Sequence, residues 1–368
     1  MSGPRVALVH ERLTEIAGSE HVVDQLAAQW PGAQLHVPIF RDSVLADGWS
    51  HRPATSWLNL WYRALGQRTY APLLPLMPMA MRGLRLGDPD VVLISHHAFA
   101  SQAVYATDAP AIAYVHSPAR WAWDPALRAG EASGPAGAAA LTALAALARR
   151  GEVDAAPKLA AVVANSTEVA VRIGRWWGRT AMVVHPPVDT DFFTPDRSIP
   201  REDFFLLAGR LVPYKRPDLA VIAAQRANVS LVVVGDGRSL EQCRRLAGPN
   251  TTFLGHVTRG QLRDLHRRCR AVVMPGLEDF GIVPVEAMAC GGAVVARGAG
   301  GALDSVRAGV TGQLVDGTGD DELIDGFACA MRRFEPGDYD PGRIRMWAQT
   351  FSRRAFRARM QEVVDDVG

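Results

Sequence analysis

The sequence predicts an α/β fold of two domains, each built on a mainly parallel β-sheet. Short apolar strands alternate with amphipathic helices along almost the whole chain, and this alternation is typical of parallel sheets. The chain has 368 residues, which is more than one average domain and enough for two hydrophobic cores. A proline-rich segment near the middle marks the boundary between the two domains.

The predicted strands fall into two groups. Residues 1–190 are expected to form the first domain, with strands at Val6–Val9, Gln34–Val37, Val91–Ile94, Ile112–Val115, Ala161–Ala164 and Met182–Val184. Residues 200–350 are expected to form the second, with strands at Phe204–Ala208, Leu231–Val234, Thr252–Leu254, Ala271–Met274 and Ala293–Ala296. The segment between them, His185–Pro200, has four prolines in sixteen residues, which neither a helix nor a central strand tolerates.

Composition narrows the class of protein. Hydrophobic residues at 48% and charged residues at 21% are ordinary for a globular protein in water. The formal net charge of +2, without a basic tract interleaved with aromatic residues, argues against a nucleic-acid partner. The four cysteines lack metal-ligand spacing and indicate a reduced cytoplasmic compartment. No apolar run is long enough to span a bilayer, and the first residues are typical of a strand rather than of a signal peptide.

The most informative segment is residues 275–292, which follows an apolar strand. Because proline is favoured at the first helical position, we expect a helix to begin near Pro284. Glu278 then lies in the loop before this helix, and Glu286 lies inside it. Two carboxylates at fixed places beside a helix N-terminus are suited to accept hydrogen bonds from hydroxyl groups.

Two sets of groups that could bind an anion accompany these carboxylates. The N–H groups of Gly281 and Ile282 are expected at the helix N-terminus, a place able to hold phosphate. Arg210 and Lys215 follow another strand, where cations would stabilise the charge on a leaving nucleoside diphosphate. A solvated basic turn would explain this cation pair equally well on its own, but the carboxylate loop favours a binding site. Together these features predict a site for a sugar nucleotide.

Two further patterns favour structural roles. Gly235 and Gly237 resemble the start of a dinucleotide fingerprint, but Leu240 stands where the third glycine belongs, so a tight strand-to-helix turn is the better interpretation. The loop still lies on the side of the sheet where ligands bind. Asp189 and Asp191 could hold a divalent ion, but they lie in the proline-rich segment before two phenylalanines, which favours a structural role.

The first domain offers a second set of candidates. Gly18 and Ser19 open a helix after the first strand, and their N–H groups could face a diphosphate; a plain helix cap is an equally good interpretation. His116 ends a strand on the ligand side of the sheet, so we expect it to contact substrate rather than to fill the core. The pair His96-His97 has the same placement and a weaker case.

Three aromatic or apolar stretches have two interpretations each. The loop at residues 120–124 has two tryptophans that could stack on a sugar or pack inside the domain. The stretches Trp57–Arg63 and Leu73–Arg82 are expected to be helices that cover the sheet; the alternative is contact with a membrane interface. The alanine-rich segment Gly130–Arg150 is expected to end as a helix.

Taken together, these residues resemble the family 4 retaining glycosyltransferases of the GT-B fold, which has two facing Rossmann-like domains with the active site in the cleft between them. The spacing from Glu278 to Glu286 matches that family's E-x7-E motif. Arg210 and Lys215 match its paired cations, and Gly18 matches its N-terminal glycine loop. The stretches at residues 95–99 and 116–124 look like those of the bacterial mannosyl- and rhamnosyltransferase subgroup.

The resemblance implies a role for each residue. Arg210 and Lys215 would bind the donor diphosphate, Glu286 the ribose hydroxyls, and Glu278 the transferred hexose, with His116 at the sugar near the reaction centre. The other implied donor contacts are Gly18, Ser19, Gly235, Gly255, His256, Val257, Phe280, Gly281 and Ile282. The resemblance also implies retention of anomeric configuration, no required metal or cofactor, and a C-terminal helix, residues 352–368, that packs back on the first domain.

The resulting hypothesis is a hexosyltransferase that uses a nucleotide sugar, with GDP-mannose as the preferred donor. The expected acceptor is a glycan or a lipid-linked molecule, in the cytoplasm or at the inner face of the plasma membrane. One alternative is a nucleotide-sugar epimerase on the same scaffold, and another is a non-catalytic subunit that binds a nucleotide sugar. A nicotinamide dehydrogenase is disfavoured by Leu240.

Overall fold

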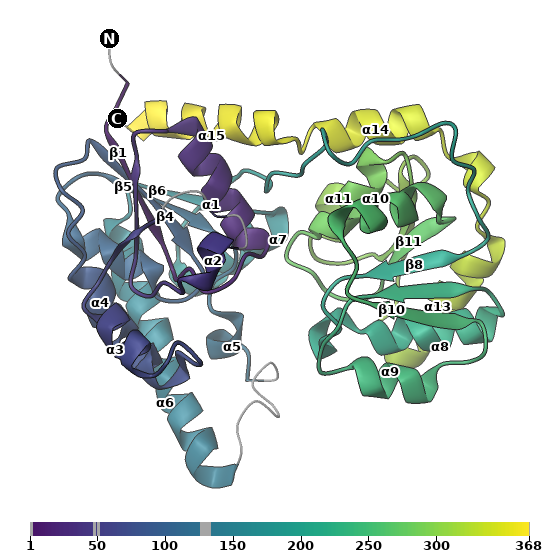
Figure 1. Cartoon of the computed structure of the whole chain (residues 1–368), viewed down its shortest axis with the longest axis horizontal. Helices are drawn as coiled ribbons and strands as arrows, with labels where there is room; N and C mark the ends of the chain where they lie inside the picture. The colour runs from purple at the N-terminus through teal and green to yellow at the C-terminus, as the bar shows by residue number, and fades with distance from the viewer. Residues whose placement is uncertain (1–2, 47–48, 50–51, 126–133, 368) are drawn as a thin grey trace. The chain divides into compact units, whose positions relative to one another are not determined.

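The computed structural model describes residues 3–46, 49, 52–125 and 134–367. The chain divides into two compact units: unit 1 is residues 1–185 with 356–368, and unit 2 is residues 186–355. Each unit has one parallel sheet with helices on both faces (Figure 1). The predicted α/β fold with two parallel sheets is confirmed.

The sheet of unit 1 has seven strands in the order β3-β2-β1-β4-β5-β6-β7. Their bounds are β1 Val6–His10, β2 Gln34–Val37, β3 Ala54–Thr55, β4 Val91–His96, β5 Ala111–Val115, β6 Ala161–Ala164 and β7 Met182–Val183. Alternate residues of β1 join different cores, Ala7 and Val9 on one face and Val6 and Leu8 on the other. The sheet is therefore buried on both faces, as parallel sheets are.

Different helices cover the two faces of this sheet. On one face, α1 (Gly18–Gln29) and the C-terminal α15 (Arg353–Val367) complete the core. On the other, α4 (Met77–Arg82), α6 (Gly134–Ala155) and α7 (Thr167–Trp177) do so. The remaining short helices are α2 Ser43–Ala46, α3 Leu58–Ala64, η1 Ala71–Leu76, η2 Ala100–Ala106, α5 Arg120–Trp123 and η4 Ala156–Lys158. Part of the alanine-rich segment, residues 130–133, lies outside the described residues.

The sheet of unit 2 has six strands in the order β10-β9-β8-β11-β12-β13. Their bounds are β8 Phe205–Ala208, β9 Leu231–Val234, β10 Thr251–Gly255, β11 Ala271–Met274, β12 Ala293–Arg297 and β13 Gly312–Val315. Helices α8 (Pro217–Ala227) and α13 (Asp320–Arg333) lie on one face, and α10 (Arg259–Arg268) and α11 (Ile282–Ala289) on the other (Figure 1). The other helices are η5 Pro213–Lys215, α9 Leu240–Leu246, α12 Ala302–Ser305, η6 Pro336–Asp338 and α14 Pro341–Gln349.

The structure forms every strand that the sequence predicts and adds β3 and β13. The first is only two residues long, and the second begins with Gly312, whose missing side chain lets the backbone approach Val294. The helix predicted to begin near Pro284 is α11, which begins two residues earlier, at Ile282. Proline is tolerated there because the N–H groups of the first turn have no partner within the helix.

Each sheet has one point at which the strand order changes direction. In unit 1 this switch point lies between β1 and β4, and in unit 2 it lies between β8 and β11. The carboxyl ends of parallel strands meet at one edge of a sheet, and ligands of such folds bind outside that edge at the switch point. These two places are therefore where functional residues are expected.

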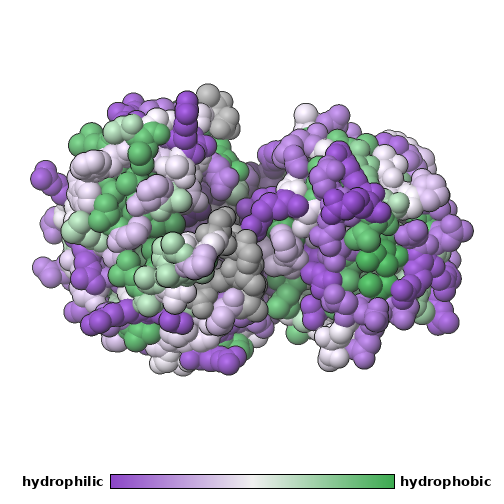
Figure 2. Space-filling view, turned by 90° about the horizontal axis from the view of Figure 1, so that it is seen from below, coloured by the Kyte–Doolittle hydropathy of each residue, from purple (hydrophilic) through white to green (hydrophobic). Residues whose placement is uncertain are grey.

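The two apolar stretches of unit 1 form helices that are buried on one side. In α3, Leu58 and Tyr62 are fully buried, whereas Leu60 and Trp61 are 70% and 61% exposed. Figure 2 shows hydrophobic side chains at the surface of this unit among hydrophilic ones. No helix in the described part of the chain combines the length and the apolarity that crossing a bilayer requires.

Candidate active site

An ion pair marks the switch point of unit 2. Lys215 follows β8 and Glu278 follows β11, and the Nζ of the lysine lies 2.8 Å from Oε1 of the glutamate. Both side chains are partly exposed, at 23% and 17%. Two residues that the sequence assigns to neighbouring parts of one ligand are therefore ion-pair partners of each other.

The loop that carries Glu278 is held by close backbone packing. The N–H of Gly301 donates to the Glu278 carbonyl at 3.0 Å. A Cβ atom on Gly301 would lie 2.2 Å from the Cα of Phe280, so only glycine fits there. The ring of Phe280 is buried and packs on Phe351 with 5.4 Å between ring centroids. Phe280 can therefore contact a ligand only through its backbone.

Helix α11 continues directly from this loop. Its N-cap is Gly281, which has a φ of 90° in the left-handed region and lacks a side chain that could cap the helix. The amides of the first turn, beginning with Ile282, have no partner within the helix. A helix N-terminus of this kind attracts anions through its N–H groups and its dipole.

Glu286 lies one turn into α11 and keeps 18% of its side chain exposed. Burial raises the pKa of its carboxyl to about 7, which the positive charge of Arg259 opposes and the negative charge of Asp189 reinforces. Behind it, Nε2 of the fully buried His266 lies 4.0 Å from Oε2 of the glutamate. Neither ring nitrogen of His266 has a hydrogen-bond partner in the described part of the chain.

The other predicted contacts of unit 2 lie at the same edge of its sheet. Arg210 follows β8 and is exposed, with no ion pair to any described residue. Gly235 follows β9, and its N–H donates to the carbonyl of Gly255, the last residue of β10, at 2.8 Å. His256 is exposed, and Val257 packs partly against the core. The structure thus brings all the unit 2 candidates to one edge.

The two patterns expected to be structural have structural partners. Asp189 forms ion pairs with Arg259 at 2.8 Å and with Arg353 at 3.0 Å. Within the described residues, no group of three or more histidine, cysteine, aspartate or glutamate side chains has a geometry that could hold a metal ion. The glycine turn after β9 is tight, and α9 begins at Leu240, where a fingerprint would have its third glycine.

In unit 1, His116 follows β5 and is fixed on three sides. Its N–H donates to the His96 carbonyl at 3.1 Å, and its carbonyl accepts from the side-chain amide of Asn165 at 2.7 Å. The ring stacks on that of His97, with 4.5 Å between centroids and 15° between planes. His116 is 9% exposed, so a single orientation of its ring is held at the edge of the sheet.

The N-terminus of α1 already has a carboxylate. Oε2 of Glu20 accepts from the N–H of Ala17 at 2.9 Å and from the hydroxyl of Ser19 at 2.8 Å. Gly18 is the first residue of the helix and is exposed. The helix cap considered for Gly18 and Ser19 is therefore present, and it is made by the neighbouring glutamate.

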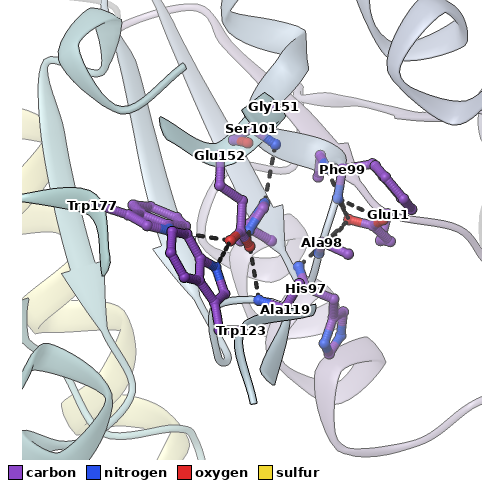
Figure 3. A network of polar contacts seen from close by, with 12 residues as sticks. Glu11, His97, Ala98, Phe99, Ser101, Ala119, Trp123, Gly151, Glu152 and Trp177 are labelled. Carbon is purple, nitrogen blue, oxygen red and sulfur yellow. Dashed lines mark hydrogen bonds and ion pairs between the residues drawn. The ribbon is translucent and has the colours of Figure 1, made fainter. Parts of the chain in front are cut away.

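Two buried carboxylates hold the loops around His116 (Figure 3). Glu11 accepts hydrogen bonds from the N–H groups of four consecutive residues, His97, Ala98, Phe99 and Ala100. Glu152 accepts from His96, the N–H of Ala119, and the indole N–H groups of Trp123 and Trp177. The indole N–H of Trp123 is thereby occupied inside the unit, and its ring stacks on Trp176.

The sequence alone missed the residues behind His116. Ser95 joins its ring to His10, and His10 joins Glu20. The available signal was position: His10 ends β1 and Ser95 lies near the end of β4, the two strands that flank the switch point. In unit 2 the missed residue is His266, which is fully buried in the last turn of α10 and leaves no sequence signal.

Comparison with known proteins gives the family. Residues 16–192 match the family described as "Glycosyltransferase Family 4", and residues 189–333 match "Glycosyl transferases group 1". A D-inositol 3-phosphate glycosyltransferase of Mycobacterium sp. (strain KMS) is 38% identical over 182 residues, covering 41% of this chain and 41% of that protein. The chain thus matches less than half of the length of this relative.

Two solved structures show the same fold over nearly the whole chain. Anabaena HepE in complex with UDP has 20% sequence identity and a TM-score of 0.72, covering 98% of this chain and 100% of its own. The sucrose-phosphate synthase of Thermosynechococcus elongatus has 16% identity and a TM-score of 0.69, with 99% of each chain covered. The two matched family models and these neighbours agree with the two Rossmann-like units, and the chain belongs to glycosyltransferase family 4 with the GT-B fold.

Proposed function

We propose that the protein transfers a sugar from a nucleotide-sugar donor to a glycan or lipid-linked acceptor. The observation that carries this proposal is the Lys215–Glu278 pair at the switch point of unit 2, beside the N-terminus of α11. A cation for a diphosphate and an acceptor for sugar hydroxyls thereby lie side by side, with 2.8 Å between Nζ and Oε1, so that both are within reach of adjoining parts of one donor.

Each group has a part in the transfer. Lys215 and Arg210 stabilise the negative charge that develops on the leaving diphosphate, together with the amides of Gly281 and Ile282. Glu278 orients the transferred sugar. Glu286 binds the ribose; because burial raises the pKa of its carboxyl to about 7, the group both donates and accepts hydrogen bonds near neutral pH.

The finer assignments rest on the family resemblance. They are GDP-mannose as the donor, retention of configuration, and transfer without a metal ion. Among the structural neighbours, Anabaena HepE binds UDP and UDP-glucose, so the base is tested by comparing GDP, UDP and dTDP as ligands in thermal denaturation. A bound nucleotide raises the midpoint with the logarithm of its concentration. Anomeric analysis of the product and turnover in the presence of a chelator test the other two assignments.

The ion pair also supplies a test of the site. Glu278→Gln releases Lys215 from its partner, so we expect tighter binding of the free nucleoside diphosphate together with a loss of sugar transfer. Lys215→Ala should weaken the binding of that nucleotide and lower turnover at least about 100-fold. Lys158→Ala, a change at the other lysine of the chain, is the control. Near-normal turnover in both site variants would refute the assignment, and acceptor-independent interconversion of the sugar would favour an epimerase.

A surface of unit 1 supports contact of the protein with a membrane that carries the acceptor. Large apolar side chains on α3 and its neighbours are exposed: Trp57, Leu60, Trp61, Leu65, Leu76 and Met79. Arg63 and Arg68 belong to the same stretch of sequence and are also exposed, and Arg63 pairs with Asp42. Tryptophan and arginine beside apolar residues suit an anionic interface. Co-sedimentation with anionic vesicles should fall in the double variant Leu60→Ser, Trp61→Ser; binding unchanged from wild type would refute this proposal.

A further inference from the structure

A chain of hydrogen bonds runs behind His116 through three other side chains. Nε2 of His116 lies 2.8 Å from Oγ of Ser95, and this oxygen lies 2.9 Å from Nδ1 of His10. Nε2 of His10 lies 3.1 Å from Oε1 of Glu20. All four residues are at most 9% exposed. They come from four different segments that meet at the switch point of the unit 1 sheet, so the fold rather than the local sequence assembles the chain.

The direction of these hydrogen bonds is set at the Glu20 end. Burial alone would raise the pKa of this carboxyl, but the hydrogen bond from His10, the positive charge of that ring when it is protonated, and the hydrogen bond from Ser19 lower it to about 2. An ionised carboxylate only accepts hydrogen bonds. Its Oε2 already accepts from the N–H of Ala17 and the hydroxyl of Ser19. Oε1 must therefore accept as well, and the proton of this bond belongs to Nε2 of His10.

The donor at the Glu20 end fixes which group donates in each of the other hydrogen bonds. When His10 carries a single proton, at Nε2, its Nδ1 is an acceptor, and the hydroxyl of Ser95 donates to it. The oxygen of Ser95 is left to accept from Nε2–H of His116. Burial lowers the pKa of His116 to about 3, so its ring is neutral near pH 7 and holds only that one proton. Nδ1 of His116 is then unprotonated, and no described residue hydrogen-bonds to it.

We propose that Glu20, His10 and Ser95 are positioning residues that fix the tautomer of His116, so that its unprotonated Nδ1 accepts a hydrogen bond from a hydroxyl of the transferred sugar. This rests on the proposed function, which supplies the sugar. The principle is the one by which a buried carboxylate sets the tautomer of a catalytic histidine in hydrolases. The hydrogen bond to Ser95 holds the ring against a flip, because a flip would move Nε2 away from the serine oxygen.

Replacing Glu20 by glutamine reverses every bond in the chain. The amide oxygen must take the place of Oε2, because Ala17 N–H donates there, and the NH₂ group then faces His10. His10 is forced to accept at Nε2 and to donate from Nδ1 to Ser95. The serine hydroxyl turns to donate to Nε2 of His116, whose proton moves to Nδ1. The nitrogen offered to the sugar changes from an acceptor to a donor.

The test reads the tautomer directly in the ligand-free protein. In protein with ¹⁵N-labelled histidine near pH 8, above the usual titration range of imidazole, the ¹⁵N shifts distinguish protonated from unprotonated ring nitrogens. The signals of His116 are assigned by their absence in His116→Asn. We expect a proton on Nε2 in the wild type and on Nδ1 in Glu20→Gln. Glu15→Gln, the same change on an exposed carboxylate nearby, should leave the tautomer unchanged.

A second variant makes the test independent of any effect of Glu20 on the helix cap. Ser95→Ala interrupts the chain, so adding Glu20→Gln to it should no longer move the proton of His116. A wild type that carries its proton on Nδ1, or a tautomer that Glu20→Gln leaves unchanged, would overturn the proposal whether or not the protein is a transferase.

Binding measurements test whether this chain of hydrogen bonds affects recognition of the sugar. Glu20→Gln should bind the nucleoside diphosphate like the wild type but the nucleotide sugar about 10-fold more weakly, the loss of one hydrogen bond. A purely structural defect would weaken both ligands. If the wild type binds no nucleotide sugar, the proposed function fails. The ¹⁵N result still shows whether Glu20 sets the tautomer of His116.

Discussion

The variant Glu286→Gln measures how much free energy of unfolding unit 2 loses by burying a carboxylate. Burial raises the pKa of this group from 4.5 to about 7, so the folded state favours the protonated form. A difference of this size corresponds to about 3 kcal/mol in the free energy of unfolding once the group is ionised in both states. Because the side chain keeps 18% of its surface exposed, this figure is an upper limit.

The sign of the effect follows from proton binding. Well below pH 4.5 the carboxyl is protonated in both states and adds no pH dependence. Between pH 4.5 and about 7 only the unfolded chain releases the proton, so the stability of the wild type falls as the pH rises. Above about pH 7 the loss is complete. Glutamine does not ionise, so the stability of the variant relative to the wild type should rise between pH 4.5 and about 7. It should stay higher above about pH 7.

Thermal denaturation without nucleotide, followed from about pH 5 to about pH 8.5, measures this advantage. A gain of about 3 kcal/mol corresponds to a rise of roughly 6–12 °C in the midpoint of a unit of this size. Glu335→Gln makes the same change of charge on an exposed side chain and corrects for net-charge effects. A Glu286→Gln variant that is no more stable than the wild type near pH 8 would refute the burial argument.

Two further substitutions test the packing that supports the sites. Gly301→Ala places a Cβ 2.2 Å from the Phe280 backbone, so it should displace the Glu278 loop and weaken nucleotide binding, measured by calorimetry; Gly337→Ala, with nothing within 4 Å, should bind like the wild type. Glu152→Gln puts an NH₂ group among four hydrogen-bond donors, so denaturant unfolding should show a loss of about 2–4 kcal/mol in unit 1, and an unchanged midpoint would contradict the network.

The sequence predicted those parts of the molecule that local patterns encode. Continuous apolar runs predicted the central strands. Position after such a strand predicted Arg210, Lys215, Glu278 and His116 as site residues, because strand ends share an edge in a parallel sheet. It failed for β13, where a glycine and a glutamine interrupt the apolar run that marks a strand.

What the sequence could not supply are partnerships over long separations. The hydrogen bond between Ser95 and His10 joins residues 85 positions apart, and that between His96 and Glu152 joins residues 56 positions apart. Neither pair has a periodic signal, because the pairing depends on how the strands are ordered in the sheet. The direct bond between Lys215 and Glu278 is a case of the same kind: both residues were expected at the site, but not as each other's partner.

The path of the chain through unit 1 has a consequence for its synthesis. One face of its sheet is completed by Phe356, Met360, Val363 and Val364 of α15, which are buried against β-strands made near the start of the chain. The ribosome delivers these side chains only after all of unit 2 has been made. Residues 1–185 therefore leave the ribosome with one apolar face that α15 has yet to cover, whereas unit 2, which is continuous in sequence, can finish folding before α15 is made.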